Sequence, residues 1–179
     1  MSDQWPRYEV FKQEREGGPF RNVGSVHAPD AELALLNARD VFARRPACHS
    51  LWVVPAAAIA ARSVQEPLPD AAPGPAGPLA AEPYAVCAKQ SQRQAMTYVD
   101  YLGHVAARSA AEALRLAPAA FDAPDATVWW AFPEAAITRS DPADAPGLAA
   151  ATGKRFRLPN QYHTVFTMQK IRRGDEEAT

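Results

Sequence analysis

Cysteine is scarce in this chain, which has only Cys48 and Cys87 among 179 residues. The two residues form neither a CxxC pair nor a disulfide framework, so they favour a reducing compartment. We expect both to be buried as small apolar side chains. The net charge is only −1, without the basic excess that a protein covering phosphates needs. The composition therefore argues against a nucleic-acid partner.

Long apolar runs and targeting signals are also missing. No stretch approaches the roughly 20 apolar residues of a membrane-spanning helix. The segment Met1-Ser2-Asp3-Gln4 has neither the basic nor the apolar region of a secretory signal. We expect a cytoplasmic protein with no membrane partner.

Motifs for catalysis or cofactor binding are absent from the sequence. There is no GxGxxG, Walker loop or GxSxG elbow, and no histidine lies in an HExxH or ExxH pattern. Asp100 and His104 should share one face of a strand, yet at about 3.3 Å per residue they lie roughly 13 Å apart, too far for a direct acid-base pair. The sequence predicts no catalytic residue, no cofactor and no metal.

The element around which the chain is organised is a helix over residues 30–45. Asp30 can cap it by accepting from the free N–H groups of the first turn, and Pro46 prevents continuation past Arg45. Apolar side chains recur at three- and four-residue spacing, which predicts one buried face. The members of that face are Ala31, Ala34, Leu35, Ala38, Val41 and Phe42.

Extended segments flank this helix. Residues 8–13 and 20–28 read as strands joined by a hairpin, in which Gly17-Gly18 tolerates the left-handed conformation of such turns. Residues 50–54 read as a third strand, and residues 55–59, opened by a proline, as a short helical turn. Trp52 should be a core residue of the third strand.

The segment after residue 83 resembles the segment before residue 63. Paired positions include Tyr8 and Tyr84, Gly24 and Gly103, Ala34 and Ala113, Trp52 and Trp130, and Pro55 and Pro133. We interpret this as a tandem duplication. The predicted domains are module 1 (1–63), a Pro-rich linker (64–83), a diverged module 2 (84–140) and an extended tail or docking arm (141–179), in which 141–159 is a surface loop.

The predicted fold is α+β, with two tandem strand-strand-helix-strand modules whose antiparallel sheets pack as an intramolecular pseudo-dimer. One module of this size buries little surface and leaves sheet edges unpaired, and a linker makes pairing intramolecular. In module 2, Ser109 and Glu112 form a capping box, and Pro118 should end the helix near Ala117 or kink it.

Two groups of residues are candidates for a partner interface. The first lies on the helix of module 1 and consists of Asn37, Arg39, Asp40, Arg44 and Arg45. Its segment 37–40 has no counterpart in module 2. The second lies in the tail and consists of Lys154, Arg155, Phe156, Arg157, Tyr162 and Phe166. Aromatic residues and arginine are favoured at interfaces. A solvated helix face and one extra strand are the respective alternatives.

Module 1 also resembles a known family. The segments Trp5 to Phe11, Val23 to Ala28, Asn37-Ala38-Arg39-Asp40 with Arg44-Arg45, and Ser50 to Val54 are similar in order and spacing to the PaaB family, the B subunit of ring-1,2-phenylacetyl-CoA epoxidase. The segment Lys154 to Pro159 resembles the C-terminal part of that family more weakly. Typical members have a single copy, so the second module is a departure from the family.

The resemblance implies a non-catalytic subunit of a bacterial multicomponent di-iron monooxygenase. In that family the A subunit holds the di-iron centre, a C subunit supports it, a reductase supplies electrons, and the B subunit is implicated as a bridge between A–C units. Two alternatives remain open. One is an accessory subunit of a different di-iron oxygenase, and the other is a tandem α+β barrel enzyme with His27 or His104 as base.

Overall fold

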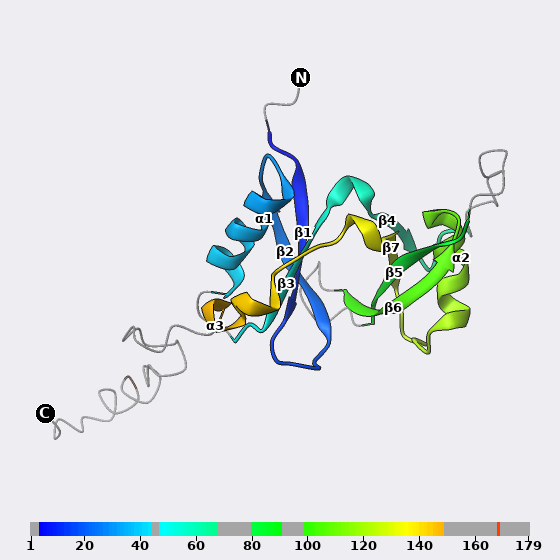
Figure 1. Ribbon diagram of the computed structural model, residues 1–179. Helices are drawn as coiled ribbons and strands as arrows, with labels where there is room; N and C mark the ends of the chain where they lie inside the picture. The colour runs from blue at the N-terminus through cyan, green and yellow to red at the C-terminus, as the bar shows by residue number, and fades with distance from the viewer. Residues whose placement is uncertain (1–3, 44–46, 68–79, 91–98, 149–167, 169–179) are drawn as a thin grey trace, which may run out of the picture.

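The structure is a computed structural model that describes residues 4–43, 47–67, 80–90, 99–148 and 168. Two successive parts of the chain share one order of elements (Figure 1). The first part contains β1 (Arg7–Gln13), β2 (Phe20–His27), α1 (Ala31–Ala38), the π-helical turn η1 (Arg39–Ala43), β3 (Ser50–Pro55), the 3₁₀ turn η2 (Ala56–Ala58) and β4 (Ala60–Ser63). The second contains β5 (Glu82–Lys89), β6 (Asp100–Ala107), α2 (Ala110–Ala120), β7 (Val128–Pro133), the 3₁₀ turn η3 (Glu134–Ala136), β8 (Thr138–Arg139), the 3₁₀ turn η4 (Pro142–Asp144) and α3 (Ala145–Leu148).

The strands form one antiparallel sheet in the order β4-β7-β5-β6-β2-β1-β3-β8. The counterparts in the two parts of the chain are β1 and β5, β2 and β6, β3 and β7, and β4 and β8. When the strand order is read backwards and each strand is replaced by its counterpart, the same order results. The junction between the two parts is β2 with β6, where Arg21 pairs with Asp100 and the N–H of Asn22 donates to the carbonyl of Val99 at 2.9 Å. The prediction of an α+β fold with antiparallel strands is confirmed.

The short strands β4 and β8 were not predicted. β4 leaves the first part and pairs with β7 along Ala60 to Ser63, whereas β8 leaves the second part and pairs with Trp52 and Val53 of β3. The strand-strand-helix-strand order therefore lacks one strand in each module. The two strands were missed because they are short. Segments of four and two residues carry too little alternation of apolar and polar side chains to be recognised in sequence.

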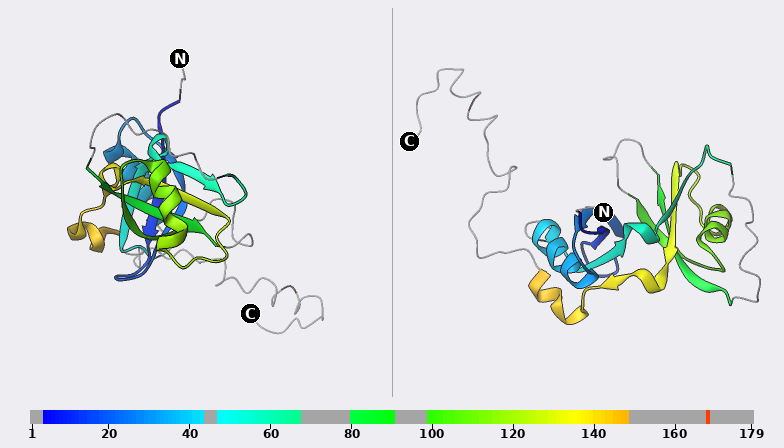
Figure 2. Two further views of the ribbon diagram at one scale, coloured as in Figure 1. Left: turned by 90° about the vertical axis from the view of Figure 1, so that its right-hand side faces the viewer. Right: turned by 90° about the horizontal axis from the view of Figure 1, so that it is seen from above.

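Three apolar cores separate the layers of the molecule. One lies between α1 and its strands, and another lies between α2 and its strands. The third lies between the two halves of the sheet and contains Phe11, Trp52, Phe132 and Ile137. Figure 2 shows the result from above, with α1 and α2 at opposite ends and the strands between them. Trp52 belongs to this middle core and stacks on Phe20 at 3.6 Å between ring centroids, so its prediction as a core residue is confirmed.

Equivalent bulges bend the two hairpins. The register of β1 and β2 shifts between Val10 and Phe11, and that of β5 and β6 shifts between Val86 and Cys87. Beside them, Gly24 and Gly103 adopt φ of 131° and 155°, each under the ring of a phenylalanine, Phe42 or Phe121. Only glycine enters this region of φ without strain, and the absent Cβ lets the ring approach the strand.

The predicted N-termini of both helices are right, and the prediction that the second helix ends near Ala117 is wrong. The predicted end of the first helix at Arg45 lies outside the described residues. The carboxylate of Asp30 accepts from the N–H of Leu33 at 2.8 Å, and the hydroxyl of Ser109 accepts from the N–H of Glu112 at 3.2 Å. α2 continues through Pro118 to Ala120, three residues beyond the predicted end. Pro118 only removes one N–H, and the turn is retained because Phe121 still donates to the carbonyl of Ala117.

The start of the predicted tail is also different from the prediction. Residues 141–148 were expected to be loop, but they form η4 and α3, and Asp141 caps the first turn by accepting from the N–H of Ala143 at 2.8 Å. Leu148 at the end of α3 is buried in the core of α1. The predicted linker ends in strand, because β5 begins at Glu82. None of the helices in the described ranges is long and apolar enough to cross a membrane.

Removing the cap of α1 should lower stability measurably. We expect Asp30→Ala to decrease the free energy of unfolding by about 1 kcal/mol, because the N–H of Leu33 loses its acceptor. Urea denaturation followed by circular dichroism measures the change. Ser109→Ala should cost a similar amount at α2, whereas Asp125→Ala, at an exposed position outside any helix, should change little. Equal losses for Asp30→Ala and Asp125→Ala would contradict the capping role.

Candidate protein-interaction surface

The outward side of α1 and η1 carries large apolar side chains in contact with solvent. Leu33, Leu36 and Val41 are 43%, 54% and 63% exposed. We use the name α1 surface for these three residues with the adjacent Asn37, Arg39 and Asp40. Contiguous exposed apolar side chains with a polar rim are typical of protein-protein contacts.

Val41 was predicted to lie on the buried face of the helix, and the structure contradicts this. The buried positions are Ala34, Ala38 and Ala43, so the last interval is five residues rather than four. The cause is η1, because a π-helical turn holds one more residue than an α-helical turn and rotates the following side chains out of phase. Val41 therefore turns towards solvent, while Phe42 lies half-buried against Gly24.

The predicted polar residues of this surface differ in their surroundings. Arg39 and Asp40 are exposed, as a rim requires. Asn37 is half-buried, and its amide donates to the carbonyl of His27 at 3.2 Å, so it connects α1 to β2. Arg44 and Arg45 lie outside the described residues.

The second predicted group belongs to the tail. Lys154, Arg155, Phe156, Arg157, Tyr162 and Phe166 all lie outside the described residues. Their role at an interface stays a prediction, and so does the alternative of an added strand.

Sequence reasoning missed Leu33 and Leu36. Both leucines lie three residues apart, out of phase with the Ala34 and Ala38 pair that packs on the sheet. The available signal was their three-residue spacing, which places both leucines on the side of the helix away from the sheet. A solvated helix face normally carries polar side chains there.

On α2, charged side chains stand where α1 has its two exposed leucines. Phe42 and Phe121 occupy equivalent places under Gly24 and Gly103, and this correspondence matches Leu33 with Glu112 and Leu36 with Arg115. Arg115 and Glu112 form an ion pair at 3.7 Å. Among the described residues, the three exposed apolar side chains of α1 and η1 therefore have no full counterpart on α2, where Leu116 is the exposed leucine.

The two histidines considered as bases lie at the surface of the molecule. His27 and His104 are exposed, and Nδ1 of His27 is 2.9 Å from the carbonyl oxygen of Trp5. The prediction that Asp100 and His104 share a face is wrong. On the paired strands β5 and β6, Asp100 lies opposite Ala88, which belongs to the core under α2, and His104 lies opposite Ala85, which belongs to the middle core. The two side chains are therefore on opposite faces of the sheet, because the bulge between Asp100 and His104 reverses the alternation of side chains.

Both cysteines are free and buried, at 5% exposure for Cys48 and 0% for Cys87. Burial raises the pKa of the Cys48 thiol, and Lys12 nearby partly offsets this increase. Burial raises the pKa of the Cys87 thiol well above its ordinary value, with Asp100 adding to the effect. Both therefore remain protonated thiols, as expected for small apolar core residues. Within the described ranges, no three histidine, cysteine or acidic side chains come together as metal ligands.

Glu9 is the buried carboxylate of the middle layer, at 7% exposure. One of its oxygens accepts from the amide of Asn22 at 3.1 Å, and the other lies 3.3 Å from Nε of Arg7. Both partners lie on β1 and β2, so this group stabilises the hairpin that carries α1.

Comparison with known proteins finds a match for the first part of the chain. The PaaB family model, described as "Phenylacetic acid degradation B", matches residues 4–73. The first part of the chain is therefore similar to the PaaB family. The predicted resemblance is thereby confirmed for module 1, and all six residues of the α1 surface fall inside the matched range.

A curated relative from Escherichia coli (strain K12), the B subunit of 1,2-phenylacetyl-CoA epoxidase, is 48% identical over 62 residues. The aligned part is 35% of this chain and 65% of the relative, so this chain spans about two thirds of the length of that PaaB-family protein. No solved structure matches the chain.

Proposed function

We propose that this protein is a non-catalytic subunit of a bacterial multicomponent di-iron monooxygenase of the phenylacetyl-CoA epoxidase type. In this role it joins the catalytic A subunit and the C subunit in a larger assembly. The relative's name supports the complex, and the exposed Leu33, Leu36 and Val41 of the PaaB-family module support a role in binding proteins. The free thiols of Cys48 and Cys87 suit action in the cytoplasm.

We further propose that the chain is a tandem duplication whose two PaaB-like modules form an intramolecular pseudo-dimer. The repeated order of elements, the equivalent bulges and the reversible strand order support this arrangement. In a homodimer with this pairing, β4 of each subunit would complete the sheet of the other. Fusion into one chain makes that exchange intramolecular.

The two modules then have different tasks. The α1 surface of module 1 binds the oxygenase subunits, and module 2 supplies the second half of the sheet without an equivalent apolar face, because Glu112 and Arg115 replace the two leucines. One such chain would contribute one partner surface where a dimer of single-copy subunits contributes two.

Charge on the α1 surface should abolish assembly. We expect tagged full-length protein, co-expressed with its A and C subunits, to co-purify with both, and the double variant Leu36→Glu/Val41→Glu to retain them at least about tenfold less, since two carboxylates would be desolvated at the contact. The matched control is Leu116→Glu, at a 38% exposed leucine of α2.

Thermal denaturation of each variant verifies folding, since all three positions are exposed. Failure of the unmodified protein to bind either oxygenase subunit would refute the proposed function. Equal loss with Leu116→Glu would instead place the contact elsewhere on the molecule. Turnover of several aryl-CoA thioesters by the assembled complex separates the phenylacetyl-CoA epoxidase from a different di-iron oxygenase.

A further inference from the structure

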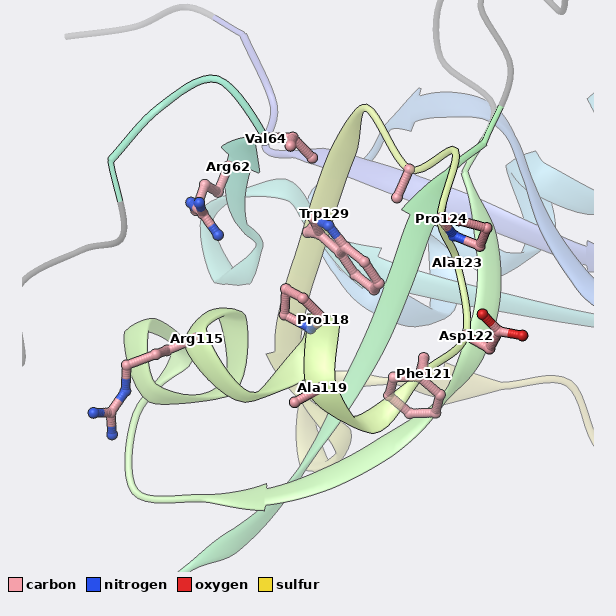
Figure 3. A pocket seen from close by; sticks show the side chains of 11 residues that line it. Arg62, Val64, Arg115, Pro118, Ala119, Phe121, Asp122, Ala123, Pro124 and Trp129 are labelled. Carbon is pink, nitrogen blue, oxygen red and sulfur yellow. The ribbon is translucent and has the colours of Figure 1, made fainter.

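A groove of about 530 Å³ opens beside α2 in module 2 (Figure 3). Its floor is apolar and includes Pro118, Phe121 and Trp129, and Val64 at its side is 48% exposed. In Figure 3, Arg62 and Arg115 lie towards one end of the groove and Asp122 towards the other. The groove is lined by the helix, by the loop that follows it and by β4 with the next residue.

The equivalent place in module 1 is filled by the chain itself. The strand register and the two equivalent glycine-phenylalanine contacts show which positions correspond. Pro118 corresponds to Arg39, Phe121 to Phe42, and Trp129 to Leu51. α3 lies here, since a Cβ on its Gly147 would be 3.7 Å from the guanidinium of Arg39. The next residue, Leu148, is 3% exposed and belongs to one core with Ala38, Ala43 and Leu51.

The place beside α1 is filled and the groove beside α2 is open because the chain follows a different path after β8 than after β4. After β8, η4 and α3 return over module 1 and insert Leu148 into its core. After β4, the N–H of Val64 donates to the carbonyl of Thr127 at 3.0 Å, and a turn follows in which Glu66 donates to the carbonyl of Ser63. Among the described residues after β4, Val64 lines the side of the groove, and none of residues 65–67 lines it.

The charge at the open groove indicates what fits it. Arg62 takes the place of Ser140, a buried serine whose hydroxyl accepts from the N–H of Leu51 at 3.0 Å. The guanidinium of Arg62 donates to the neutral carbonyl of Glu66 at 3.0 and 3.3 Å. That carbonyl carries no charge, so Arg62 retains its capacity to pair with a carboxylate. Arg115 lies at the same end with its side chain 46% exposed, in an ion pair with Glu112 at 3.7 Å.

We propose that the groove of module 2 binds a short segment of a partner protein that carries carboxylates followed by one leucine-sized side chain. The segment α3 of this chain is the internal precedent, with Asp141 and Asp144 ahead of Leu148. Its acidic end would lie at Arg62 and Arg115, and its apolar end on Trp129 and Pro118. The comparison rests on the module pairing proposed above, but it does not require the partner to be an oxygenase subunit.

A peptide segment fits the lining better than a small metabolite does. Sites for small metabolites contain several polar groups that converge on the ligand within an apolar enclosure. Here Arg115 and Asp122 are exposed and Arg62 is half-buried, while the floor offers apolar surface. An open apolar floor with charged ends is typical of grooves that take one anchoring side chain of a peptide.

Fluorescence anisotropy with a synthetic peptide tests this proposal on the full chain. The probe is fluorescein-labelled, amidated DPADAPGL, the sequence of residues 141–148. We expect saturable binding that Ala119→Trp abolishes by filling the groove, and that Arg62→Glu weakens about tenfold or more by reversing the charge at its end. The matched control, Arg108→Ala, removes an exposed arginine outside the groove and should leave binding unchanged.

A second peptide with asparagine in place of leucine distinguishes anchoring from simple charge attraction, and it should not bind. Binding that survives Ala119→Trp, or that is equal for both peptides, overturns the proposal. So does an absence of binding at about 1 mM peptide. Because no oxygenase subunit is present, failure here is distinct from failure of the co-purification experiment.

Discussion

Phe11→Ala is expected to lower the free energy of unfolding by about 3–5 kcal/mol, the range for removing a fully buried phenylalanine. Phe11 is 0% exposed and lies in the middle core. Its ring is 5.7 Å from that of Phe132 and 6.5 Å from that of Trp130, both on β7. The substitution therefore opens a cavity between the two modules rather than inside one of them.

Urea denaturation followed by tryptophan fluorescence measures this loss. Because both modules share the middle core, we expect a single transition in the unmodified protein, shifted to lower urea concentration in the variant. Trp5→Ala, at a 61% exposed position, should change the free energy by less than about 0.5 kcal/mol.

A double-mutant cycle isolates the contact across the modules. Phe11→Ala and Phe132→Ala should be coupled by about 1 kcal/mol, because the two rings contact each other. Two separate unfolding transitions in the unmodified protein, or additive losses in the cycle, would show that the modules do not stabilise each other.

Gly103→Ala is expected to lower the free energy of unfolding by about 2–5 kcal/mol, as the sum of two effects. The φ of 155° is strained for any side chain, and an added Cβ would lie 2.8 Å from Cε1 of Phe121. That distance is shorter than a carbon-carbon contact allows, so either β6 or the phenylalanine ring has to move.

Two further variants separate strain from crowding. Gly17→Ala, at φ of 69° with nothing near the new Cβ, should lose only about 1 kcal/mol. In Gly103→Ala/Phe121→Leu the smaller side chain should relieve the crowding, so that its loss is less than the sum of the two single losses. Thermal denaturation gives all four values. A loss for Gly103→Ala no greater than that for Gly17→Ala would contradict the close packing of the bulge on Phe121.

The helix starts and the hairpin turn could be predicted because their causes lie within a few residues. Asp30 and Ser109 cap their helices by accepting from N–H groups three residues ahead, and Gly17 supplies the positive φ of the turn. The end of α1 could not be predicted, because no residue pattern around Arg39 marks the change from α-helix to π-helix.

The candidate surface was only partly predictable for the same reason. The polar rim at Arg39 and Asp40 follows from the residue types, which are rarely buried. The exposure of Val41 depends on the rotation caused by η1, and the importance of Leu33 and Leu36 depends on which side of α1 the sheet covers. Residue type alone predicts burial for all three.

The α+β class, the longer strands, the helix caps, the repeated order of those elements and the resemblance of the first part of the chain to the PaaB family could all be predicted from the sequence alone. These features depend on local geometry and on residue patterns along the chain. The tertiary structure was needed to show that β4 pairs with β7 and β8 with β3. It also showed that Leu148 is buried beside α1 while the groove beside α2 stays open among the described residues, and that three apolar side chains of α1 and η1 face solvent. Each of these depends on contacts between segments far apart in the chain, which local pattern does not encode.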